Sequence, residues 1–337
     1  MSNLNDLTAL ALPSGRSLVA DETESRLSLS LEGQPLIRLR LFRELALHIE
    51  VEERFGLPAG QAFWAACYWL FARNPDCQHL TWRLGEAPTE ALLSGLLIPT
   101  ETVGEYRCER TLFWQLPQPW LGASRTDSYP QQMVISAGKR HPLRPAKPRG
   151  EVYRRFDARL GAWISLRSVE IEQDLVRFNR WQNSPRVASF WEEEGSLQKH
   201  REYLSKLDAD PHTLTLIGCF DDQPFAYFEA YWAKEDRIAP FYDAGDYDRG
   251  IHMLVGEEAH RGPHKVASWL SALVHYLFLD DPRTQRVVAE PRADNAKMIG
   301  HLHNQCFHCE KEFDFPHKRA ALMVLGRERF FDRCKLA

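Results

Sequence analysis

The chain has 337 residues, of which 44% are hydrophobic and 26% are charged, and its formal net charge is −4. The length suits two domains, and the composition is that of a globular protein, which excludes extensive disorder. The small negative charge gives no reason to expect a nucleic-acid-binding surface. No early segment has the order of a signal peptide, and residues 63–72, among the most apolar runs, have about half the length that crosses a bilayer. We therefore expect a cytoplasmic protein without a membrane segment.

The seven cysteines favour reduced thiols over disulfides. Their number is odd, they are scattered, and several lie in apolar runs, as expected in a reducing compartment. Cys306 and Cys309 form a CxxC motif with histidines nearby, and these residue types are the usual zinc ligands. No second CxxC or HxxxH pair follows, so we expect ordinary packing here and no metal.

In the N-terminal half, the pattern predicts a hairpin, a helix, a strand and a further helix. Residues 27–41 alternate around Glu32-Gly33, which is a hairpin signal. Helical spacing over residues 64–71 is followed by a strand over 79–84 and a helix over 89–97. Residues 138–150 contain three prolines and a basic run, which exclude a helix or a central strand. We interpret this segment as a linker between domains over residues 1–137 and 151–337.

The C-terminal half alternates helices with strands. The helical segments stop at turn signals such as Asn183-Ser184-Pro185, and Ser196 and Asp294 are candidate N-caps. The predicted helices cover residues 171–181, 196–207, 269–279 and 296–303, and the predicted strands cover 214–220, 225–232, 250–256, 286–290 and 320–325.

The two halves look related. Residues 64–93 (WAACYWLFARNPDCQHLTWRLGEAPTEALL) follow residues 269–299 with only a small gap, so we predict two copies of one α/β unit. The copies differ where chemistry would take place: His252 falls opposite Leu47, Asp294-Asn295 opposite Pro88-Thr89, and the basic turn at 261–265 opposite the uncharged residues 56–60. We therefore expect the first copy to be a structural or interface partner.

A basic turn lies between the strand that carries His252 and the next helix. The first N–H groups of a helix and its dipole attract phosphate oxygens, glycine allows a close approach, and the cations add charge. A solvated basic loop is the alternative interpretation. The turn is neither GxxxxGK[ST] nor GxGxxG, which disfavours a nucleoside triphosphate or a dinucleotide. Its residues are His260, Arg261, Gly262, His264 and Lys265.

This order of elements resembles the GNAT N-acyltransferase superfamily. The resemblance implies an α/β (α+β) fold with a mixed, mostly antiparallel sheet flanked by helices, and a degenerate GNAT-like N-terminal unit. It also implies an acyl-CoA between two parallel strands, with Arg261, Gly262, His264 and Lys265 at its pyrophosphate and the backbone of Leu254, Val255 and Gly256 along its pantetheine. Asn295 matches a common asparagine of the superfamily. His264 and Val266 depart from its small residues, and Cys306-Phe307 stands where Gly-Phe is usual.

A narrower resemblance covers nearly the whole C-terminal half. The blocks GEVYRRFDARL, FDDQPFAYFEAYWAKEDRI, HMLVGEEAHRG, EPRADN and KEFDFPHKR resemble the N6-hydroxylysine acetyltransferases of aerobactin-type siderophore pathways. This implies transfer of acetyl from acetyl-CoA to a hydroxylated side-chain nitrogen, without a metal. It also implies small-molecule substrates and other enzymes of the pathway as partners, and neither nucleic acid nor a membrane.

The chemistry predicts roles for two side chains. A hydroxylamine is already neutral near pH 7, so the enzyme mainly needs a group that accepts the proton released from nitrogen, which suits a histidine. His252 is that candidate, and Asp294 could orient it, bind the acceptor or take the proton itself. A backbone N–H of Leu254 or Val255 would stabilise the oxyanion. The alternatives are a core histidine and a simple helix cap.

The acceptor should enter opposite the CoA. Trp191, Tyr231 and Trp232 could line a slot for its chain, and Arg249 or Lys318 could bind its α-carboxylate, although such aromatics are often core residues. Rival interpretations keep the fold but use succinyl-CoA or another acyl-CoA with N-hydroxycadaverine or N-hydroxyputrescine. A rival of another class is a non-catalytic CoA-binding pathway protein.

Overall fold

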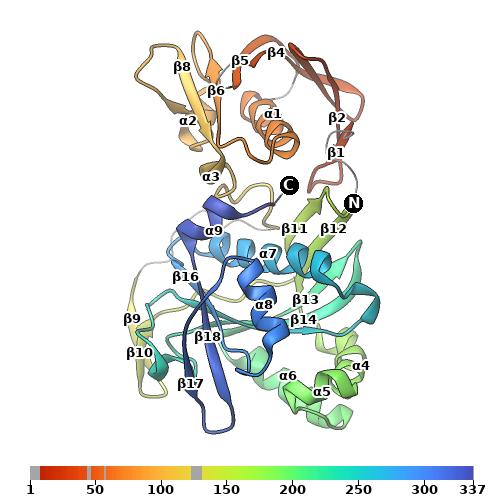
Figure 1. Ribbon diagram of the computed structural model, residues 1–337, viewed down its shortest axis with the longest axis vertical. Coiled ribbons are helices and arrows are strands. Elements are labelled where there is room, and N and C mark those ends of the chain that lie inside the picture. Colours follow the sequence, from red (N-terminus) through yellow and green to blue (C-terminus); the bar gives the residue numbers. More distant parts are fainter. Residues whose placement is uncertain (1–7, 44–46, 57, 123–130, 337) are drawn as a thin grey trace. The chain divides into compact units, whose positions relative to one another are not determined.

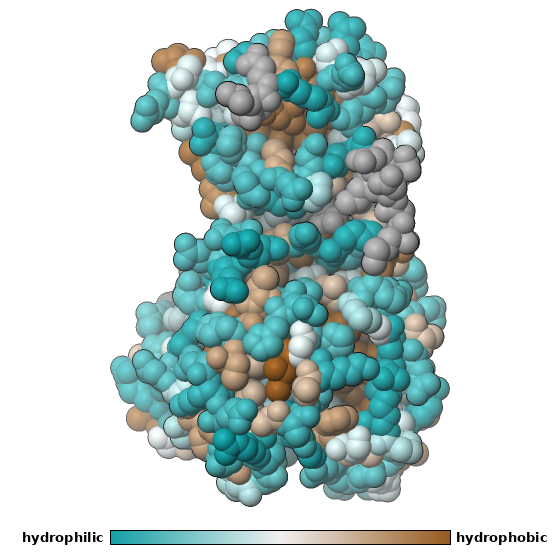
Figure 2. Space-filling model, viewed as in Figure 1, coloured by the Kyte–Doolittle hydropathy of each residue, from teal (hydrophilic) through white to brown (hydrophobic). Residues whose placement is uncertain are grey.

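The computed structural model describes residues 8–43, 47–56, 58–122 and 131–336 (Figure 1). The chain divides into two compact units: an N-terminal unit of Met1–Trp120, Arg155–Ala162 and Lys335–Ala337, and a C-terminal unit of Leu121–Arg154 and Trp163–Cys334. Hydrophilic residues predominate on the visible face of each unit (Figure 2). Within the described ranges, no helix has the length and apolar character needed to cross a membrane.

The described part of the N-terminal unit contains an eight-stranded sheet with the order β1-β2-β3-β4-β5-β6-β8-β7. Neighbouring strands are antiparallel, except that β5 and β6 are parallel. The strands are β1 (Ala9–Ala11), β2 (Ser17–Glu22), β3 (Arg26–Leu31), β4 (Gln34–Arg43), β5 (Leu47–Arg54), β6 (His79–Arg83), β7 (Ile98–Pro99) and β8 (Glu105–Glu109). The helices are α1 (Ala59–Arg73), α2 (Thr89–Leu93) and α3 (Arg110–Phe113).

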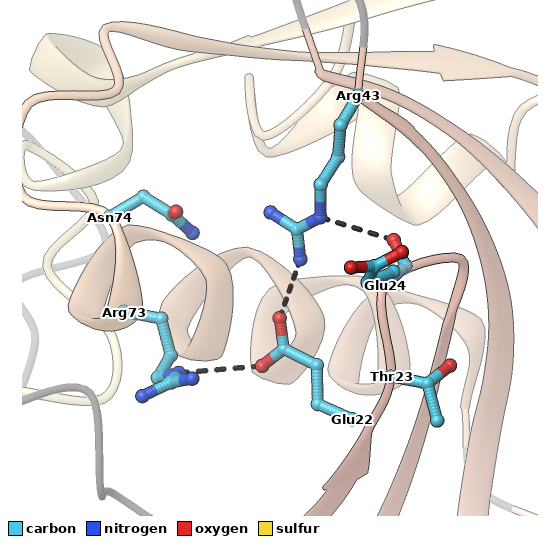
Figure 3. A pocket seen from close by; sticks show the side chains of 6 residues that line it. All are labelled: Glu22, Thr23, Glu24, Arg43, Arg73 and Asn74. Atoms are coloured by element: carbon cyan, nitrogen blue, oxygen red, sulfur yellow. Dashed lines mark hydrogen bonds and ion pairs between the residues drawn. The ribbon is translucent and has the colours of Figure 1, made fainter.

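Helix α1 is the core helix of this unit. Ten of its 15 residues are buried, which explains why its apolar residues are not confined to one stripe. At its C-terminal end, Glu22, Thr23, Glu24, Arg43, Arg73 and Asn74 line a polar pocket of about 330 Å³ (Figure 3). Both arginines of this pocket pair with Glu22, at 2.7 Å and 3.4 Å, so the pocket is neutralised by its own side chains.

The second sheet repeats this topology. Its described strands have the order β11-β12-β13-β14-β15-β16-β18-β17, and β15 and β16 are its parallel pair. The strands are β11 (Glu151–Asp157), β12 (Ala162–Ser168), β13 (Thr213–Phe220), β14 (Gln223–Trp232), β15 (Arg249–Val255), β16 (Arg286–Ala289), β17 (His308–Asp314) and β18 (Arg319–Gly326). The helices are α4 (Ile171–Gln182), α5 (Pro185–Trp191), α6 (Leu197–Ala209), α7 (Pro263–Asp280), α8 (Ala296–Asn304) and α9 (Arg327–Arg333), with short 3₁₀ turns η2 (Ala239–Phe241) and η3 (Glu258–His260).

Helices cover both faces of this sheet (Figure 1). On one face, Tyr227 and Leu254 share a core with residues of α4 and α6 such as Trp181. Successive side chains of a strand point to opposite faces, and Phe228 accordingly stacks on Trp269 of α7, with ring centroids 5.3 Å apart. Fourteen of the 18 residues of α7 are buried.

The proline-rich segment at 138–150 is fastened to the C-terminal unit. Part of it forms β10 (Lys139–Pro142), which pairs with β9 (Met133–Ser136) in a two-stranded sheet. Beyond β10, Lys147 Nζ donates to the carbonyl oxygens of Leu207, Asp208 and Thr213. The domain boundary that the sequence predicts here stays a prediction, but the segment itself is a strap held by specific hydrogen bonds.

Most predicted elements of the C-terminal half are confirmed, including the helix over 171–181 and the hairpin of β13 and β14. The predicted cap of α6 is also confirmed, because Ser196 accepts a hydrogen bond from the N–H of Lys199 at 3.1 Å. Several helix ends were predicted wrongly: α1 and α7 begin at Ala59 and Pro263, upstream of the predicted starts at residues 64 and 269. The helix over 89–97 ends at Leu93, before Gly95 adopts a φ of +74°. Helix α8 is capped by Asn295 rather than Asp294, since Asn295 Oδ1 accepts from the N–H of Met298 at 3.1 Å.

Candidate active site

The parallel strands β15 and β16 separate after a short contact. Among the described residues they pair at Arg249↔Val287 and Gly250↔Val288 and no further. Beyond this point β15 continues to pair with β14, and β16 with β18. His252 and Glu290 each lie two residues beyond the last shared pair, so their side chains meet at the point where the two strands diverge.

His252 lies between two carboxylates. Its Nδ1 is 2.7 Å from Oε2 of Glu229, and its Nε2 is 2.6 Å from Oε1 of Glu290. Glu229 faces His252 directly across the β14–β15 ladder, which places both side chains on the same face of the sheet. Both ring nitrogens face acceptors, and an imidazolium can donate to both. The side chain of His252 is 22% exposed, whereas Glu290 is fully buried.

Tyrosines occupy the remaining carboxylate oxygens. Tyr203 and Tyr227 donate to Oε1 of Glu229 at 2.5 Å and 2.9 Å, and Tyr231 donates to Oε2 of Glu290 at 2.6 Å. A Cβ atom on Gly250 would lie 2.0 Å from the ring of Tyr231, so only glycine leaves room for this tyrosine. Buried carboxylates satisfied in this way keep a fixed position.

The carboxylates hold His252 in its charged form. Burial alone would lower the pKa of His252, but the charges of Glu290 and Glu229 and the hydrogen bonds to them raise it to about 10. Burial would raise the pKa of both carboxyl groups, but His252 holds the pKa of Glu229 below its ordinary value and that of Glu290 at about 2. At neutral pH the group therefore has two negative charges and one positive charge. This corrects the expectation that His252 titrates near neutrality.

Two of the three predicted slot aromatics lie against His252. The ring centroids of Tyr231 and Trp191 are 4.8 Å and 6.4 Å from that of the imidazole. Trp232 does not join them, because the guanidinium groups of Arg144 and Arg249 lie over its ring at 4.2 Å and 4.1 Å.

The candidate anchors of the acceptor's α-carboxylate have different surroundings. Arg249 is 2% exposed and pairs with Asp280 at 2.9 Å. Its charge is therefore neutralised inside the fold by Asp280, which corrects the expectation that Arg249 binds the acceptor's carboxylate. Lys318 is half-buried, and its Nζ donates to the backbone oxygen of Glu290 at 2.7 Å. Lys318 thus lies beside the group that contains His252.

Asp294 is not brought to His252 by any contact of the described residues. Its side chain is 65% exposed and pairs with Arg292 at 2.7 Å, and this pairing lowers the pKa of Asp294. The carboxylate that meets His252 is Glu290, directly after β16, together with Glu229. The sequence reasoning missed both, although a glutamate within the aromatic strand YFEAYW is an unusual residue that signals a buried partner.

The predicted phosphate turn precedes α7. Gly262 has a φ of +118°, a conformation that favours glycine, and the next residue begins the helix. Arg261 and His264 are exposed. His260 stacks on Phe220, and Lys265 lies 4.3 Å from the centroid of that ring. Among the described residues no side chain caps the start of α7, so the turn presents helix N–H groups beside an exposed guanidinium.

Arg186 is a second cation near this turn that the sequence reasoning missed. It donates to the carbonyl oxygens of Val255 and Gly256 at 2.8 Å and 3.1 Å, and burial and the neighbouring charge of Arg261 lower its pKa. The N–H of Gly256 bonds to Phe225, so the backbone groups of Gly256 are already engaged within the protein. The backbone contacts expected of Leu254 and Val255 stay a prediction. Two neighbouring guanidinium groups beside a helix N-terminus fit a diphosphate.

The described residues contain no group of three His, Cys, Asp or Glu side chains that could hold a metal ion. The arrangement instead combines an anion-attracting turn, a gap between two parallel strands and a charged proton-handling group. Residues 170–315 match the family model described as an acetyltransferase (GNAT) domain.

Curated relatives agree with this match. The chain is 49% identical over 232 residues to a Schizosaccharomyces pombe protein provisionally named a lysine N-acyltransferase, a match that covers 68% of this chain and 69% of that protein. The chain therefore belongs to the GNAT acetyltransferase family, whose members take their acyl group from acyl-CoA, and it is an acyltransferase.

Two further relatives narrow the comparison. The chain is 47% identical over 224 residues to the N(6)-hydroxylysine O-acetyltransferase of Escherichia coli, over 66% of this chain and 70% of that protein. It is 50% identical over 200 residues to the N(5)-hydroxyornithine:cis-anhydromevalonyl coenzyme A-N(5)-transacylase of Beauveria bassiana, over 58% of this chain and 44% of that protein.

Proposed function

We propose that the C-terminal unit transfers acetyl from acetyl-CoA to the hydroxylated side-chain nitrogen of N6-hydroxylysine and so forms a hydroxamate for siderophore biosynthesis. One observation carries the proposal. In a chain with a hydroxylysine acetyltransferase among its relatives, the group of Glu229, His252 and Glu290 lies where β15 and β16 diverge. We expect the reaction in the cytoplasm, with the enzymes that supply hydroxylysine and consume the hydroxamate as functional partners.

The chemistry suits a neutral nucleophile. The hydroxylamine nitrogen attacks the thioester carbonyl, a C–N bond forms, the C–S bond breaks, and the thiolate leaves. The nitrogen of the tetrahedral adduct carries an acidic proton, and the group of three side chains accepts it. Because the imidazole of His252 is already charged at neutral pH, the added proton ends on Glu290 or Glu229, and His252, the exposed member of the group, relays it to them. Because coupled groups titrate as a unit, the base is the whole group rather than His252 or Asp294 alone.

The direct test is a steady-state assay of the purified chain with acetyl-CoA and N6-hydroxylysine, with lysine as the control. Thiol release and a coloured ferric complex should appear together, because an N-acyl hydroxamate chelates ferric iron and an O-acyl ester does not. Lysine should react far more slowly, since its ammonium must first lose a proton. Equal rates with lysine, or thiol release without the ferric colour, would overturn the proposal.

A second candidate acceptor, with a shorter side chain, also has support. The Beauveria bassiana relative is named for hydroxyornithine, whose side chain is one methylene shorter, and one methylene is worth only about 10- to 200-fold in selectivity. The same assay with N5-hydroxyornithine, N-hydroxycadaverine and N-hydroxyputrescine, and with succinyl-CoA as donor, ranks the candidates. Thiol release with none of them would favour a non-catalytic CoA-binding protein.

A further inference from the structure

The segment that follows β14, residues 233–238, carries a carboxylate close to the reaction centre. Oδ1 of Asp236 accepts a hydrogen bond from the N–H of Ile238 at 3.0 Å, whereas no described residue donates to Oδ2 or forms an ion pair with Asp236. Burial and the charge of Glu290 raise the pKa of Asp236, and the charge of His252 lowers it. Ile238 shares a core cluster with Tyr231, whose ring lies 4.8 Å from that of His252, so Asp236 is carried beside the reaction centre and keeps one oxygen free.

Two cations lie over the ring of Phe315, which shares a core cluster with Tyr231. Arg237 and Lys318 each lie 5.5 Å from the ring centroid of Phe315, so one aromatic ring holds both. Lys318 also bonds to the backbone oxygen of Glu290. Within the part of the chain that the structure describes, neither cation pairs with a carboxylate, while Arg292, the next cation nearby, pairs with Asp294 and Glu192.

The reaction centre thus has a carboxylate and two cations beside it, and among the described residues none of the three has an ion-pair partner. These charges are complementary to the α-ammonium and the α-carboxylate of an amino acid. Asp236 and Lys318 are half-buried and Arg237 is exposed, and an unpaired charge at a half-buried position costs free energy unless a ligand satisfies it. We propose that Asp236 binds the α-ammonium of the acceptor and that Lys318 with Arg237 binds its α-carboxylate, while the side chain of the acceptor extends past Tyr231 to His252. The inference rests on the proposed function and adds to it the residues that select an amino acid.

The strap at 138–150 positions this site. Nζ of Lys139 donates to the backbone oxygens of Glu235 and Asp236 at 2.6 Å and 2.8 Å. Arg144 forms two hydrogen bonds with the carboxylate of Glu235, at 2.5 Å and 2.7 Å, and both side chains are buried. The strap therefore fixes the backbone on which Asp236 is carried, which gives the proline-rich segment a positioning role.

The test crosses two variants with three acceptors: N6-hydroxylysine, N-hydroxycadaverine, which lacks the carboxylate, and 6-(hydroxyamino)hexanoate, which lacks the ammonium. Asp236→Asn should raise KM about tenfold or more for the two acceptors that carry the ammonium, hydroxylysine and hydroxycadaverine. The KM for hydroxyaminohexanoate should not change. Lys318→Met should raise KM for hydroxylysine and hydroxyaminohexanoate and spare hydroxycadaverine. The assay is thiol release from acetyl-CoA. For each combination of variant and acceptor in which KM is unchanged, kcat should also change little.

Lys139→Met tests the positioning role against a matched control in the same strap, Lys147→Met. Lys139→Met should raise KM only for the two acceptors that carry the ammonium, and Lys147→Met should not. The assignment is overturned if Asp236→Asn affects the three acceptors equally or leaves hydroxycadaverine unchanged. A wild-type enzyme that acylates none of the three would instead refute the proposed function, so the two failures are distinguishable. Thermal melts establish that each variant is folded.

Discussion

The two units share one sheet topology, but their parallel strand pairs end differently. In both units the strand after the long helix begins six residues beyond that helix, and this aligns Arg83 with Glu290. The C-terminal pair ends at Gly250↔Val288. The N-terminal pair continues to Glu50↔Arg83, two residues further in the same alignment. The two parallel strands therefore diverge at this position in the C-terminal unit, whereas in the N-terminal unit they are still paired there.

The charges at this position are also inverted. Because Arg40 faces Glu50 across the strands as Glu229 faces His252, Glu50 takes the position of His252 and Arg40 that of Glu229. In the strand register, the two carboxylates that flank an imidazole are thus replaced by two arginines that flank a glutamate, and Arg40 forms its ion pair with Glu52. This corrects the sequence comparison that placed Leu47 opposite His252, because strand register sets the correspondence and residue counts across unequal loops do not.

The N-termini of the corresponding helices, α1 and α7, also differ in whether they can accept an anion. Near the start of α1, the N–H of Gly60 bonds to Oε2 of Glu90 at 3.2 Å. A carboxylate of the protein itself therefore occupies the N-terminus of α1, whereas the N-terminus of α7, beside Arg261, has no such carboxylate among the described residues. A cavity of about 690 Å³ remains there, lined among others by Arg54 and Arg83. We infer that the N-terminal unit keeps the fold for structural reasons and has lost the anion site.

The largest expected effect comes from removing the imidazole. His252→Ala should lower kcat by about 10²- to 10⁴-fold, because the two carboxylates then have no shared cation and no exposed proton carrier. The matched control is Glu50→Ala at the corresponding position of the N-terminal unit, which should leave kcat unchanged. Thiol release at saturating substrates measures both. Near-full turnover of His252→Ala, or an equal loss in Glu50→Ala, would break the comparison.

Much of the C-terminal unit follows from its sequence because local signals and tertiary structure agree. The helix over 171–181 has apolar spacing and ends at a turn that contains Pro185, and β13 and β14 are continuous apolar strands joined at a polar hairpin. The prediction of two related units succeeded for the same reason. The local sequence pattern was sufficient wherever the prediction concerned a single helix or strand.

The carboxylate partners of His252 did not follow from the sequence. Glu229 reaches His252 through the register of β14 and β15, and Glu290 reaches it because β15 and β16 diverge after one short contact. Neither property is local to a motif. Asp294 was predicted as a partner because it was expected at the end of the neighbouring strand, but β16 ends at Ala289, and Asp294 is exposed and pairs with Arg292.

The stability of the charged group should depend on pH in a defined window. The pKa of His252 is raised to about 10, so its contribution is complete below the ordinary histidine pKa of about 6.5 and is lost as pH rises towards 10. The pKa of Glu290 is lowered to about 2, so its contribution is complete above about pH 4.5 and is lost as pH falls towards 2. The stabilisation should therefore be greatest between about pH 4.5 and 6.5.

Urea unfolding of the wild type and His252→Gln over this range measures the effect. Removing one partner of a buried ionic group costs about 3–5 kcal/mol, and the difference between the two proteins should approach that size within the window and shrink on either side. Glu50→Gln, at the corresponding half-buried position of the N-terminal unit, is the control. A difference that is constant from acidic to alkaline pH would show that His252 and Glu290 are not coupled in the folded protein.

The smallest effect tests the turn before α7 against its counterpart before α1. Arg261 is exposed and no described carboxylate pairs with it, so it is free to meet a diphosphate, and an exposed charge contact of this kind is screened by salt. Arg261→Ala should raise KM for acetyl-CoA about tenfold, which corresponds to about 1.4 kcal/mol, leave kcat nearly unchanged and weaken the salt dependence of KM. Arg54→Ala, at the cavity beside α1, should change none of these, because Glu90 already occupies that helix N-terminus. If Arg54→Ala raised KM as much as Arg261→Ala, the N-terminal cavity would have to be a working part of the donor site, and the division between a catalytic and a structural unit would fail.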